Sequence, residues 1–231
     1  MKSIYLDYNS TTPIDPIVYN KMEYYFDSNY GNPSSLHWMG VSSKKAVNKS
    51  RSLIANGLGC SSNEIIFTSG ATESINMAIK GIVASSNITK KHIITFQTEH
   101  KAVLDTCEYL EKNDVEVESL PVDEDGFINT NDIIDNIKKE TILVTILHGN
   151  NEIGTVQQLK RIGEICQNAN VPLFIDAAQT FGKIPINVSE MGIAMLAASA
   201  HKIYGPKGTG FLYKSNKLLI DPLIHGGGHE H

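Results

Sequence analysis

An apolar run over residues 193–198 is followed directly by SAHKIYGPKG, residues 199–208. The run has the length of one buried strand, and the Gly and Pro residues after it predict a turn. Lys202 therefore lies just past the carboxyl end of a strand, at the sheet edge where α/β proteins place binding and catalytic groups. An isolated lysine is usually a solvated surface charge, so the role of Lys202 depends on the segments around it.

Similar apolar runs recur along the chain and alternate with segments of helical spacing. Strands are predicted near 64–68, 92–97, 115–121, 141–147, 172–176, 194–199 and 209–213. Helices are predicted near 71–87, 100–113, 130–139 and 158–169. This alternation predicts an α/β fold, a three-layer α/β/α domain built on a mostly parallel seven-stranded sheet.

The first part of the chain departs from this pattern. Residues 1–15 hold a short strand-like piece, and TPIDP at 12–16 predicts a turn. A first helix is predicted after these prolines, and a second follows the loop at 32–35 and stops at the glycines of 57–59. We therefore divide the chain into an N-terminal segment, 1–15, and one large domain, 16–231.

Composition and charge exclude several classes of protein. The chain has 231 residues, 41% of them hydrophobic, so it can bury a sizeable core. The net charge of −5 and the lack of a long basic run argue against a nucleic-acid partner, because phosphate contacts need clustered Lys and Arg. No apolar stretch reaches the roughly 18 residues of a membrane span, and residues 1–15 do not resemble a signal peptide. We expect a cytoplasmic protein.

The three cysteines, Cys60, Cys107 and Cys166, are odd in number and widely spaced. This spacing favours a reducing compartment over a disulfide framework or a zinc site. Cys107 and Cys166 fall in predicted helices, where a cysteine is usually a small buried hydrophobic residue.

The end of the chain is rich in potential metal ligands: His225, His229, Glu230 and His231. Three glycines separate the first of these histidines from the others, so no rigid helix or strand orients the ligands. We therefore predict no metal site.

The segment SGAT at 69–72 lies where a predicted strand ends and a helix begins. Its small residues would let a ligand approach backbone N–H groups that have no partner inside the helix, which favours an anion. An ordinary capping box, with Ser69 or Thr72 as the cap, explains the segment alone equally well.

Asp176 and His100 each follow an apolar strand. A carboxylate at the end of a buried strand is costly unless it meets a cation, so Asp176 either faces a bound cation or caps the following turn. A histidine such as His100, taken alone, is more often structural than catalytic.

Four further segments accompany the lysine stretch: FTSGATES at 67–74, QTEHK at 97–101, HGNNEIG at 148–154 and DAAQT at 176–180. With YLDYN at 5–9 and GGGHE at 226–230, this ordered set resembles the cysteine desulfurases of the NifS/IscS kind, which are pyridoxal 5'-phosphate (PLP) enzymes of the class V aminotransferase family. The resemblance covers essentially the whole chain. It implies that residues 16–231 form the PLP-binding large domain of a fold-type-I PLP enzyme.

The resemblance implies a phosphate site and a covalent anchor. Ala71 and Thr72 would bind the cofactor phosphate through backbone and hydroxyl donors, and Ser199 and His201 would join them. Lys202 would carry the cofactor as a Schiff base. A phosphate held at a helix end would keep the cofactor in place while substrate replaces the lysine.

The resemblance also implies contacts to the cofactor ring. Asp176 would pair with the ring nitrogen and keep it protonated, so that the ring can accept electrons when a proton leaves the substrate. Gln179 would donate to the phenolic oxygen. His100 would lie over the ring as an acid/base group, and Asn151 would lie beside the ring and the substrate carboxylate. Lys202 and His100 are thus the implied catalytic residues.

The implied activity converts L-cysteine to L-alanine and passes the sulfur to an acceptor thiol, for iron-sulfur cluster or thio-cofactor biosynthesis. The implied partners are a second copy of the chain in a homodimer and a sulfur-acceptor or iron-sulfur scaffold protein. In the family the catalytic cysteine and the smaller domain lie downstream of the segment that matches 226–230. We therefore expect these 231 residues alone to be catalytically incomplete.

Two alternatives stay open. One is a selenocysteine lyase or another relative in the class V family. The other is a PLP-binding or scaffold chain that needs a second polypeptide for turnover.

Overall fold

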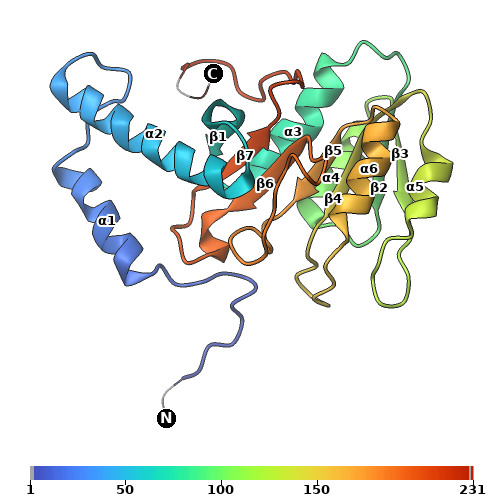
Figure 1. Ribbon diagram of the computed structural model, residues 1–231, viewed down its shortest axis with the longest axis horizontal. Helices are drawn as coiled ribbons and strands as arrows, with labels where there is room; N and C mark the ends of the chain where they lie inside the picture. Colours follow the sequence, from blue (N-terminus) through green and yellow to red (C-terminus); the bar gives the residue numbers. More distant parts are fainter. Residues whose placement is uncertain (1–2, 229, 231) are drawn as a thin grey trace.

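The computed structural model describes residues 3–228 and residue 230. One seven-stranded sheet lies between two layers of helices (Figure 1), as the sequence predicted. The strands are β1 (Ile65–Thr68), β2 (Lys91–Phe96), β3 (Val115–Leu120), β4 (Thr141–Leu147), β5 (Leu173–Asp176), β6 (Met195–Ser199) and β7 (Gly210–Lys214). The helices are α1 (Pro16–Asp27), α2 (Trp38–Leu58), α3 (Ala71–Ser85), α4 (Lys101–Glu111), α5 (Thr130–Asn136) and α6 (Leu159–Asn168). Two short 3-10 helices, η1 (Ser62–Glu64) and η2 (Ala200–Lys202), precede β1 and follow β6.

The sheet is mostly parallel, which confirms the predicted topology. Its strand order is β1-β7-β6-β5-β4-β2-β3, and β7 runs antiparallel to both of its neighbours. The pairs β2/β3, β2/β4, β4/β5 and β5/β6 are parallel. The first six strands along the chain therefore share one direction, and their carboxyl ends meet at a single edge of the sheet.

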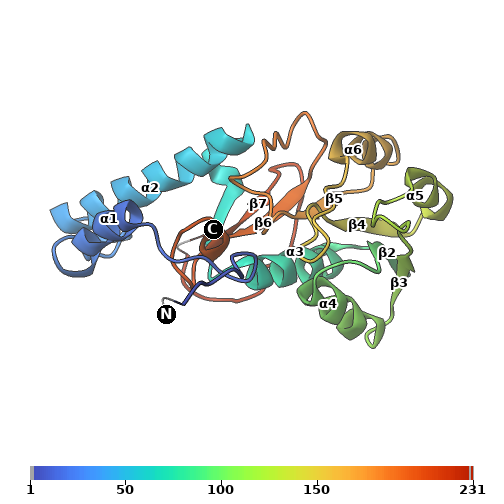
Figure 2. The same ribbon diagram turned by 90° about the horizontal axis from the view of Figure 1, so that it is seen from below.

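Helices cover the two faces of the sheet with separate hydrophobic cores. Helices α3 and α4 pack on one face, where Ile79 and Val103 contact the cluster that contains Phe174. The end of α2 and helix α6 pack on the other face around residues such as Leu58, Ile162 and Ile175. Figure 2 shows α3 and α4 on one side of the sheet and α5 and α6 on the opposite side.

Most predicted elements appear within a few residues of their expected bounds, and α5 shows why the ends differ. The predicted helix 130–139 ends at Asn136. The N–H of Lys138 donates to the Thr141 hydroxyl at 2.8 Å, so it leaves the helical pattern and the chain turns into β4.

The strand-like piece predicted within residues 1–15 is wrong, because residues 3–15 form no strand. The segment lies along the lysine stretch instead. The Thr12 N–H donates to the His201 carbonyl at 2.9 Å, and the Tyr204 N–H donates to the Thr12 hydroxyl at 2.8 Å. The Asp15 N–H donates to the Tyr204 carbonyl at 2.9 Å. These bonds satisfy backbone groups that a sheet edge would otherwise pair, so a loop replaces the strand.

The start of β7 lies very close to the turn that joins β1 to α3. A Cβ atom added at Gly210 would meet the Ala198 carbonyl oxygen at 2.5 Å and the Gly70 Cα at 2.6 Å. Only a residue without a side chain fits there. This close approach brings the start of α3 next to the end of β6, where Lys202 follows.

Candidate active site

A cavity of about 250 Å³ opens at the carboxyl edge of the sheet. It lies between the start of α3 and the ends of β4, β5 and β6, where the parallel strands were expected to place binding groups. Three apolar or small residues, Ile75, Leu147 and Ala178, form part of its wall. The rest of the wall is formed by all nine residues that the sequence singled out: Ala71, Thr72, His100, Asn151, Asp176, Gln179, Ser199, His201 and Lys202.

Lys202 follows β6 in the short helix η2, and its side chain is half-buried. Its Nζ donates to the backbone oxygen of Asn9 at 2.5 Å. Burial lowers the pKa of Lys202, and the positive charge of Lys183 lowers it further. The carboxylates of Asp176 and Asp7 act in the opposite direction on that pKa. A lysine with a lowered pKa holds more of the neutral amine, which is the nucleophilic form.

Gln179 shares the hydrogen-bond acceptor of Lys202. Its Nε2 donates to the same Asn9 oxygen at 2.8 Å. Lys202 and Gln179 can therefore both donate to a single oxygen atom. This geometry fits the prediction that Gln179 donates to the phenolic oxygen of a cofactor ring that is attached to Lys202.

Asp176 is the last residue of β5, and only 2% of it is exposed. The Ala178 N–H donates to its Oδ1 at 2.9 Å. Burial raises the pKa of Asp176, whereas the Ala178 N–H and the charges of His100 and Lys202 act to lower it. Among the residues that the structure describes, no basic side chain forms an ion pair with it. A buried, unpaired carboxylate on the cavity wall fits a cationic ring nitrogen.

The start of α3 forms the other end of the site. The Ala71 N–H donates to the Ser199 hydroxyl at 2.8 Å, so β6 reaches the helix end directly. The N-cap of α3 is Gly70, which has no side chain, so the capping box with Ser69 or Thr72 as cap is wrong. A second hollow, of about 390 Å³, adjoins this end and shares Ala71, Thr72, Ser199 and His201 with the first.

The adjoining hollow contains several donors that suit an anion, together with one carboxylate, Glu73, which accepts from the N–H and the hydroxyl of Ser69 at 2.7 and 2.6 Å. Its wall also contains Thr11 and Lys207, which the sequence did not single out as ligands. The Nδ1 of His201 lies 3.1 Å from the Thr11 hydroxyl. Burial lowers the pKa of His201, and the charges of Lys202 and Lys207 lower it further, so its neutral form is favoured. Hydroxyls, a helix N-terminus and a lysine together fit an anion.

His100 and Asn151 lie at the mouth of the cavity. His100 is the N-cap of α4, and its Nδ1 accepts a hydrogen bond from the Ala102 N–H at 3.0 Å. In the neutral ring the proton is therefore on Nε2. Asn151 is half-buried, and its backbone oxygen accepts from the Asn9 side chain at 3.4 Å.

The sequence missed two residues that shape the site. Asn9 places its carbonyl oxygen between Lys202 and Gln179, although no local pattern shows that residues 3–15 return to the sheet edge. Glu99 lies buried behind the cavity and was quoted only as part of the segment at 97–101. A carboxylate next to a predicted buried strand was the available signal for Glu99.

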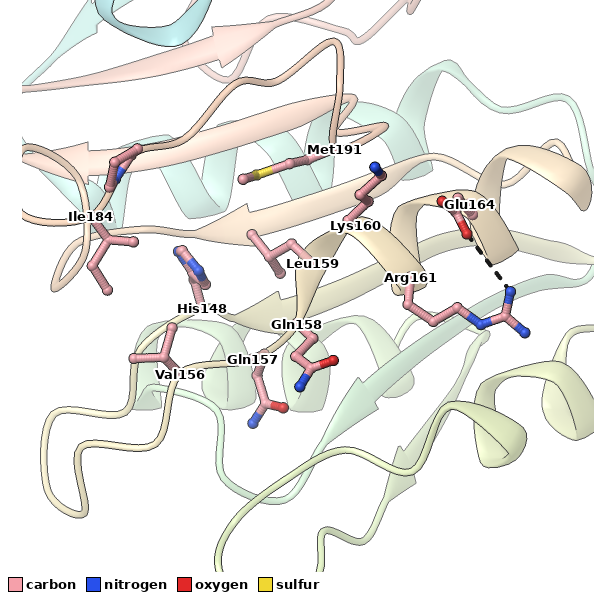
Figure 3. Close-up of a pocket in the computed structure, with 11 residues that line it drawn as sticks. His148, Val156, Gln157, Gln158, Leu159, Lys160, Arg161, Glu164, Ile184 and Met191 are labelled. Atoms are coloured by element: carbon pink, nitrogen blue, oxygen red, sulfur yellow. Dashed lines mark ion pairs between the residues drawn. The ribbon is translucent and has the colours of Figure 1, made fainter.

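A larger hollow of about 490 Å³ lies beside α6 (Figure 3), and it contains none of the nine predicted residues. Its wall is formed by the aliphatic groups of Val156, Leu159 and Met191, with charged residues at the rim. Burial lowers the pKa of His148 to about 4, so this ring is neutral. Its Nδ1 lies 2.8 Å from the Thr180 hydroxyl. We therefore place the active site in the smaller cavity.

Two clusters of potential metal ligands contain carboxylates that bind basic side chains. Glu230 binds Arg51 through oxygens at 2.9 and 2.8 Å and accepts from the Phe67 N–H at 2.7 Å, so its carboxylate is occupied. The predictions for His229 and His231 lie outside the described residues. At the opposite edge of the sheet, His92, Glu116 and Glu118 lie together, but Lys138 pairs with both carboxylates at 2.6 and 3.8 Å.

The three cysteines lie outside the cavity wall, and all three are free thiols. Cys107 and Cys166 are buried in the two cores, as predicted. Burial raises the pKa of Cys60 to about 11 and the pKa of Cys107 and Cys166 to about 12. Because the thiolate is the reactive form, these cysteines are poor nucleophiles in the folded protein.

We expect native alkylation by iodoacetamide at about pH 8 to be slow at Cys107 and Cys166, faster at half-buried Cys60, and fast at all three after denaturation. Mass spectrometry of each cysteine peptide over time gives the rates, with free cysteine as the control. Rapid labelling of native Cys107 or Cys166, or a persulfide trapped on either during incubation with L-cysteine, would overturn this result.

No helix among the described residues combines the length and the hydropathy needed to cross a lipid bilayer.

Comparison with known proteins gives a consistent match over the whole chain. Residues 4–231 match the family model of aminotransferase class-V. The cysteine desulfurase IscS of Dictyoglomus turgidum is 46% identical over 229 residues, which cover 99% of this chain and 58% of the relative. The mitochondrial cysteine desulfurase of Candida albicans is 50% identical over 232 residues, which cover 99% of this chain and 48% of the relative. The chain thus spans about half the length of these curated relatives.

Solved structures show the same fold. A structure of SspA in complex with cysteine superposes with a TM-score of 0.96 at 41% identity, and the match covers 99% of this chain and 66% of that one. A NifS-like protein superposes with a TM-score of 0.96 at 39% identity, covering 99% of this chain and 63% of that one. The predicted α/β architecture with a mostly parallel sheet is therefore confirmed.

Proposed function

The chain belongs to the aminotransferase class-V family, and we propose that it is a PLP-dependent cysteine desulfurase. The reaction would convert L-cysteine to L-alanine and pass the sulfur to an acceptor thiol. The observation that carries this proposal is the cavity at the carboxyl edge of the sheet. It brings together a lysine with a lowered pKa and a buried carboxylate that forms no ion pair with a basic side chain in the described structure.

The residues present fit PLP at both ends of the site. Ser199, Thr72, His201 and the N–H groups at the start of α3 would hold the phosphate, and Lys207 lies in the same hollow. Asp176 would hold the ring nitrogen in its protonated form. When bound, the cofactor supplies an electron-accepting ring that stabilises negative charge on the substrate α-carbon.

Two side chains are placed to move protons. Lys202 would anchor the cofactor covalently and, once released by substrate, would take the proton from the α-carbon as a neutral amine. His100 would give or take a proton at Nε2, because its Nδ1 is occupied by the Ala102 N–H. Gln179 would orient the ring by donating from Nε2.

Sulfur transfer requires a thiolate that attacks the substrate Sγ. A bond forms between the two sulfurs, the Cβ–Sγ bond breaks with its electron pair passing to carbon, and a proton then completes alanine. We assign the thiolate to none of Cys60, Cys107 and Cys166, because all three lie away from the cavity and have raised pKa values. The acceptor is a thiol supplied by another segment or another protein.

We also propose a homodimer that delivers sulfur to an acceptor or iron-sulfur scaffold protein. Helix α1 has no buried residue, and large apolar side chains such as Ile17, Phe26 and Trp38 are exposed around it. In Figure 2, α1 and the start of α2 extend away from the sheet. Apolar patches of this kind are typical of surfaces that another chain covers.

The test follows the α-hydrogen and the sulfur separately. The protein is incubated with PLP and L-cysteine in D₂O, and exchange of the α-hydrogen is followed by NMR. Alanine release is measured in parallel with L-cysteine and with L-selenocysteine, with excess dithiothreitol as the acceptor. We expect PLP-dependent exchange and a preference for cysteine.

Each contrary outcome supports one alternative. Alanine release confined to selenocysteine would favour a selenocysteine lyase. Bound PLP without α-hydrogen exchange on either amino acid would favour a cofactor-binding or scaffold chain.

A further inference from the structure

Glu99 is a buried carboxyl group behind the cavity for which the proposed mechanism has no use. Only 7% of the residue is exposed. Its Oε1 accepts a hydrogen bond from the Leu147 N–H at 2.5 Å. Its Oε2 is buried, and no partner for it exists among the described residues. A buried carboxyl group with one satisfied and one orphan oxygen is costly in its charged form.

Strands β2 and β4, which lead to Glu99 and to Leu147, also contain buried polar atoms without partners among the described residues. Thr95 in β2 and Thr145 in β4 each have a buried hydroxyl that makes no hydrogen bond to the described residues. Thr95 shares a sheet face with Ile93, and Thr145 shares it with Leu143, in the core beneath α3 and α4. No cationic side chain faces this group from either strand. Because Oε2 of Glu99 is buried and has no donor beside it in the described structure, a neutral carboxylic acid suits this position better than a carboxylate.

The charged and titratable groups near Glu99 act in the same direction. Burial raises the pKa of Glu99 well above its usual range, and the negative charge of Asp176 raises it further. The Leu147 N–H opposes this and lowers that pKa. From α4, Cys107 faces Glu99 as a neutral thiol, since burial raises the pKa of Cys107 to about 12.

The positive groups in this region act on Asp176 instead. The charges of His100 and Lys202 lower the pKa of Asp176 against the effect of burial. Asp176 pairs in register with Leu147, the residue that Glu99 binds. The two carboxyl groups thus lie near the ends of the neighbouring strands β4 and β5. Burial raises the pKa of both, but the positive charges of His100 and Lys202 oppose this rise at Asp176, where a cationic ring nitrogen would add to them.

We propose that Glu99 is a positioning residue for the cofactor site: as a neutral acid on the Leu147 N–H, it fixes the end of β4 beside β5 and leaves Asp176 as the one negative charge facing the ring nitrogen. The effect of Glu99 on the ring nitrogen rests on the proposed function. The neutral state of Glu99 is independent of the proposed function.

The first test uses the protein without cofactor and compares wild type with Glu99→Gln. Glutamine keeps the acceptor for the Leu147 N–H and a donor at the orphan position, but it cannot ionise. Ionisation of Glu99 does not affect the stability of wild type below the pKa of Glu99 in the unfolded chain, near 4.5. As the pH rises from there toward the raised pKa of Glu99 in the folded protein, the stability of wild type falls. The urea midpoints should therefore be similar at about pH 5, and Glu99→Gln should have the higher midpoint at about pH 8.

The matched control is Glu111→Gln, which changes an exposed glutamate on α4 and should leave the pH dependence as in wild type. A wild type that is more stable than Glu99→Gln at about pH 8 would overturn the proposal, because it would show that the fold uses the charged form.

The second test uses the protein with PLP and follows α-hydrogen exchange on L-cysteine against pH. Glu99→Gln should retain exchange within about threefold of wild type near neutral pH, because glutamine reproduces the neutral acid. In wild type, exchange should fall at alkaline pH as Glu99 ionises beside Asp176, and in Glu99→Gln this fall should move to higher pH.

If exchange falls at the same alkaline pH in both proteins, the proposed effect of Glu99 on Asp176 is contradicted. If wild type shows no exchange at all, the proposed function fails, and the urea comparison still decides the state of Glu99.

Discussion

Replacing Lys202 with alanine should abolish covalent attachment of PLP and reduce α-hydrogen exchange on L-cysteine by about 10²–10⁴-fold, the range typical of a lost acid/base group. Among the described residues, only Lys202 brings an amine to the cavity wall, and the lowered pKa of Lys202 suits a nucleophile and base. Absorbance of the bound cofactor and NMR-detected exchange measure the two effects.

Lys207→Ala and Lys202→Arg serve as controls for this variant. Lys207 lies in the adjoining hollow, so its loss should weaken PLP binding without removing the covalent anchor. Arginine at position 202 keeps the positive charge but is too weak a nucleophile and base to replace the amine. If Lys202→Arg retained exchange near the wild-type rate, charge would be the only contribution of Lys202, and the assigned role would be wrong.

Replacing Asp176 with alanine should have the second largest effect, and it should depend on the cofactor. Without PLP the change should destabilise the fold little, because burial raises the pKa of Asp176 and no basic side chain in the described structure forms an ion pair with it. With PLP, loss of a buried ion-pair partner should cost about 3–5 kcal/mol. The rise in melting temperature on adding PLP should therefore largely disappear.

The matched variant Asp176→Asn removes the charge but keeps an oxygen for the Ala178 N–H. It should lose most of the α-hydrogen exchange, because the ring nitrogen loses its anionic partner. If Asp176→Asn kept both the PLP-dependent melting shift and exchange, Asp176 would be a turn cap, the other interpretation that the sequence left open.

The sequence predicted the strand ends well because buried strands have a simple pattern. Asp176 and Ser199 each end a short apolar run, and parallel strands bring such ends to one edge of the sheet. The position of each residue follows from its own segment. The nine predicted residues therefore meet around one cavity, although their roles toward PLP stay predictions.

Contacts that depend on the order of the strands could not be predicted. The bond from Leu147 to Glu99 exists because β2 lies between β3 and β4, an order that no local pattern specifies. The Ser199 hydroxyl likewise accepts a hydrogen bond from the first N–H of α3, although Ser199 lies in a strand far along the chain. Helix-capping rules consider only residues next to the helix in sequence, so they could not predict this bond. The place of Asn9 depends on the bonds between Thr12 and the lysine stretch.

Reductive trapping of PLP tests directly whether Lys202 is the covalent anchor of the cofactor. The protein is incubated with PLP, reduced with borohydride and digested, and the peptides are mapped by mass spectrometry. Lys183 and Lys207 are internal controls, because Lys183 lies near enough to lower the pKa of Lys202 and Lys207 lines the adjoining hollow. We expect the pyridoxyl adduct on Lys202; an adduct confined to Lys183 or Lys207, or spread over exposed lysines, would contradict the assignment of Lys202 as the anchor.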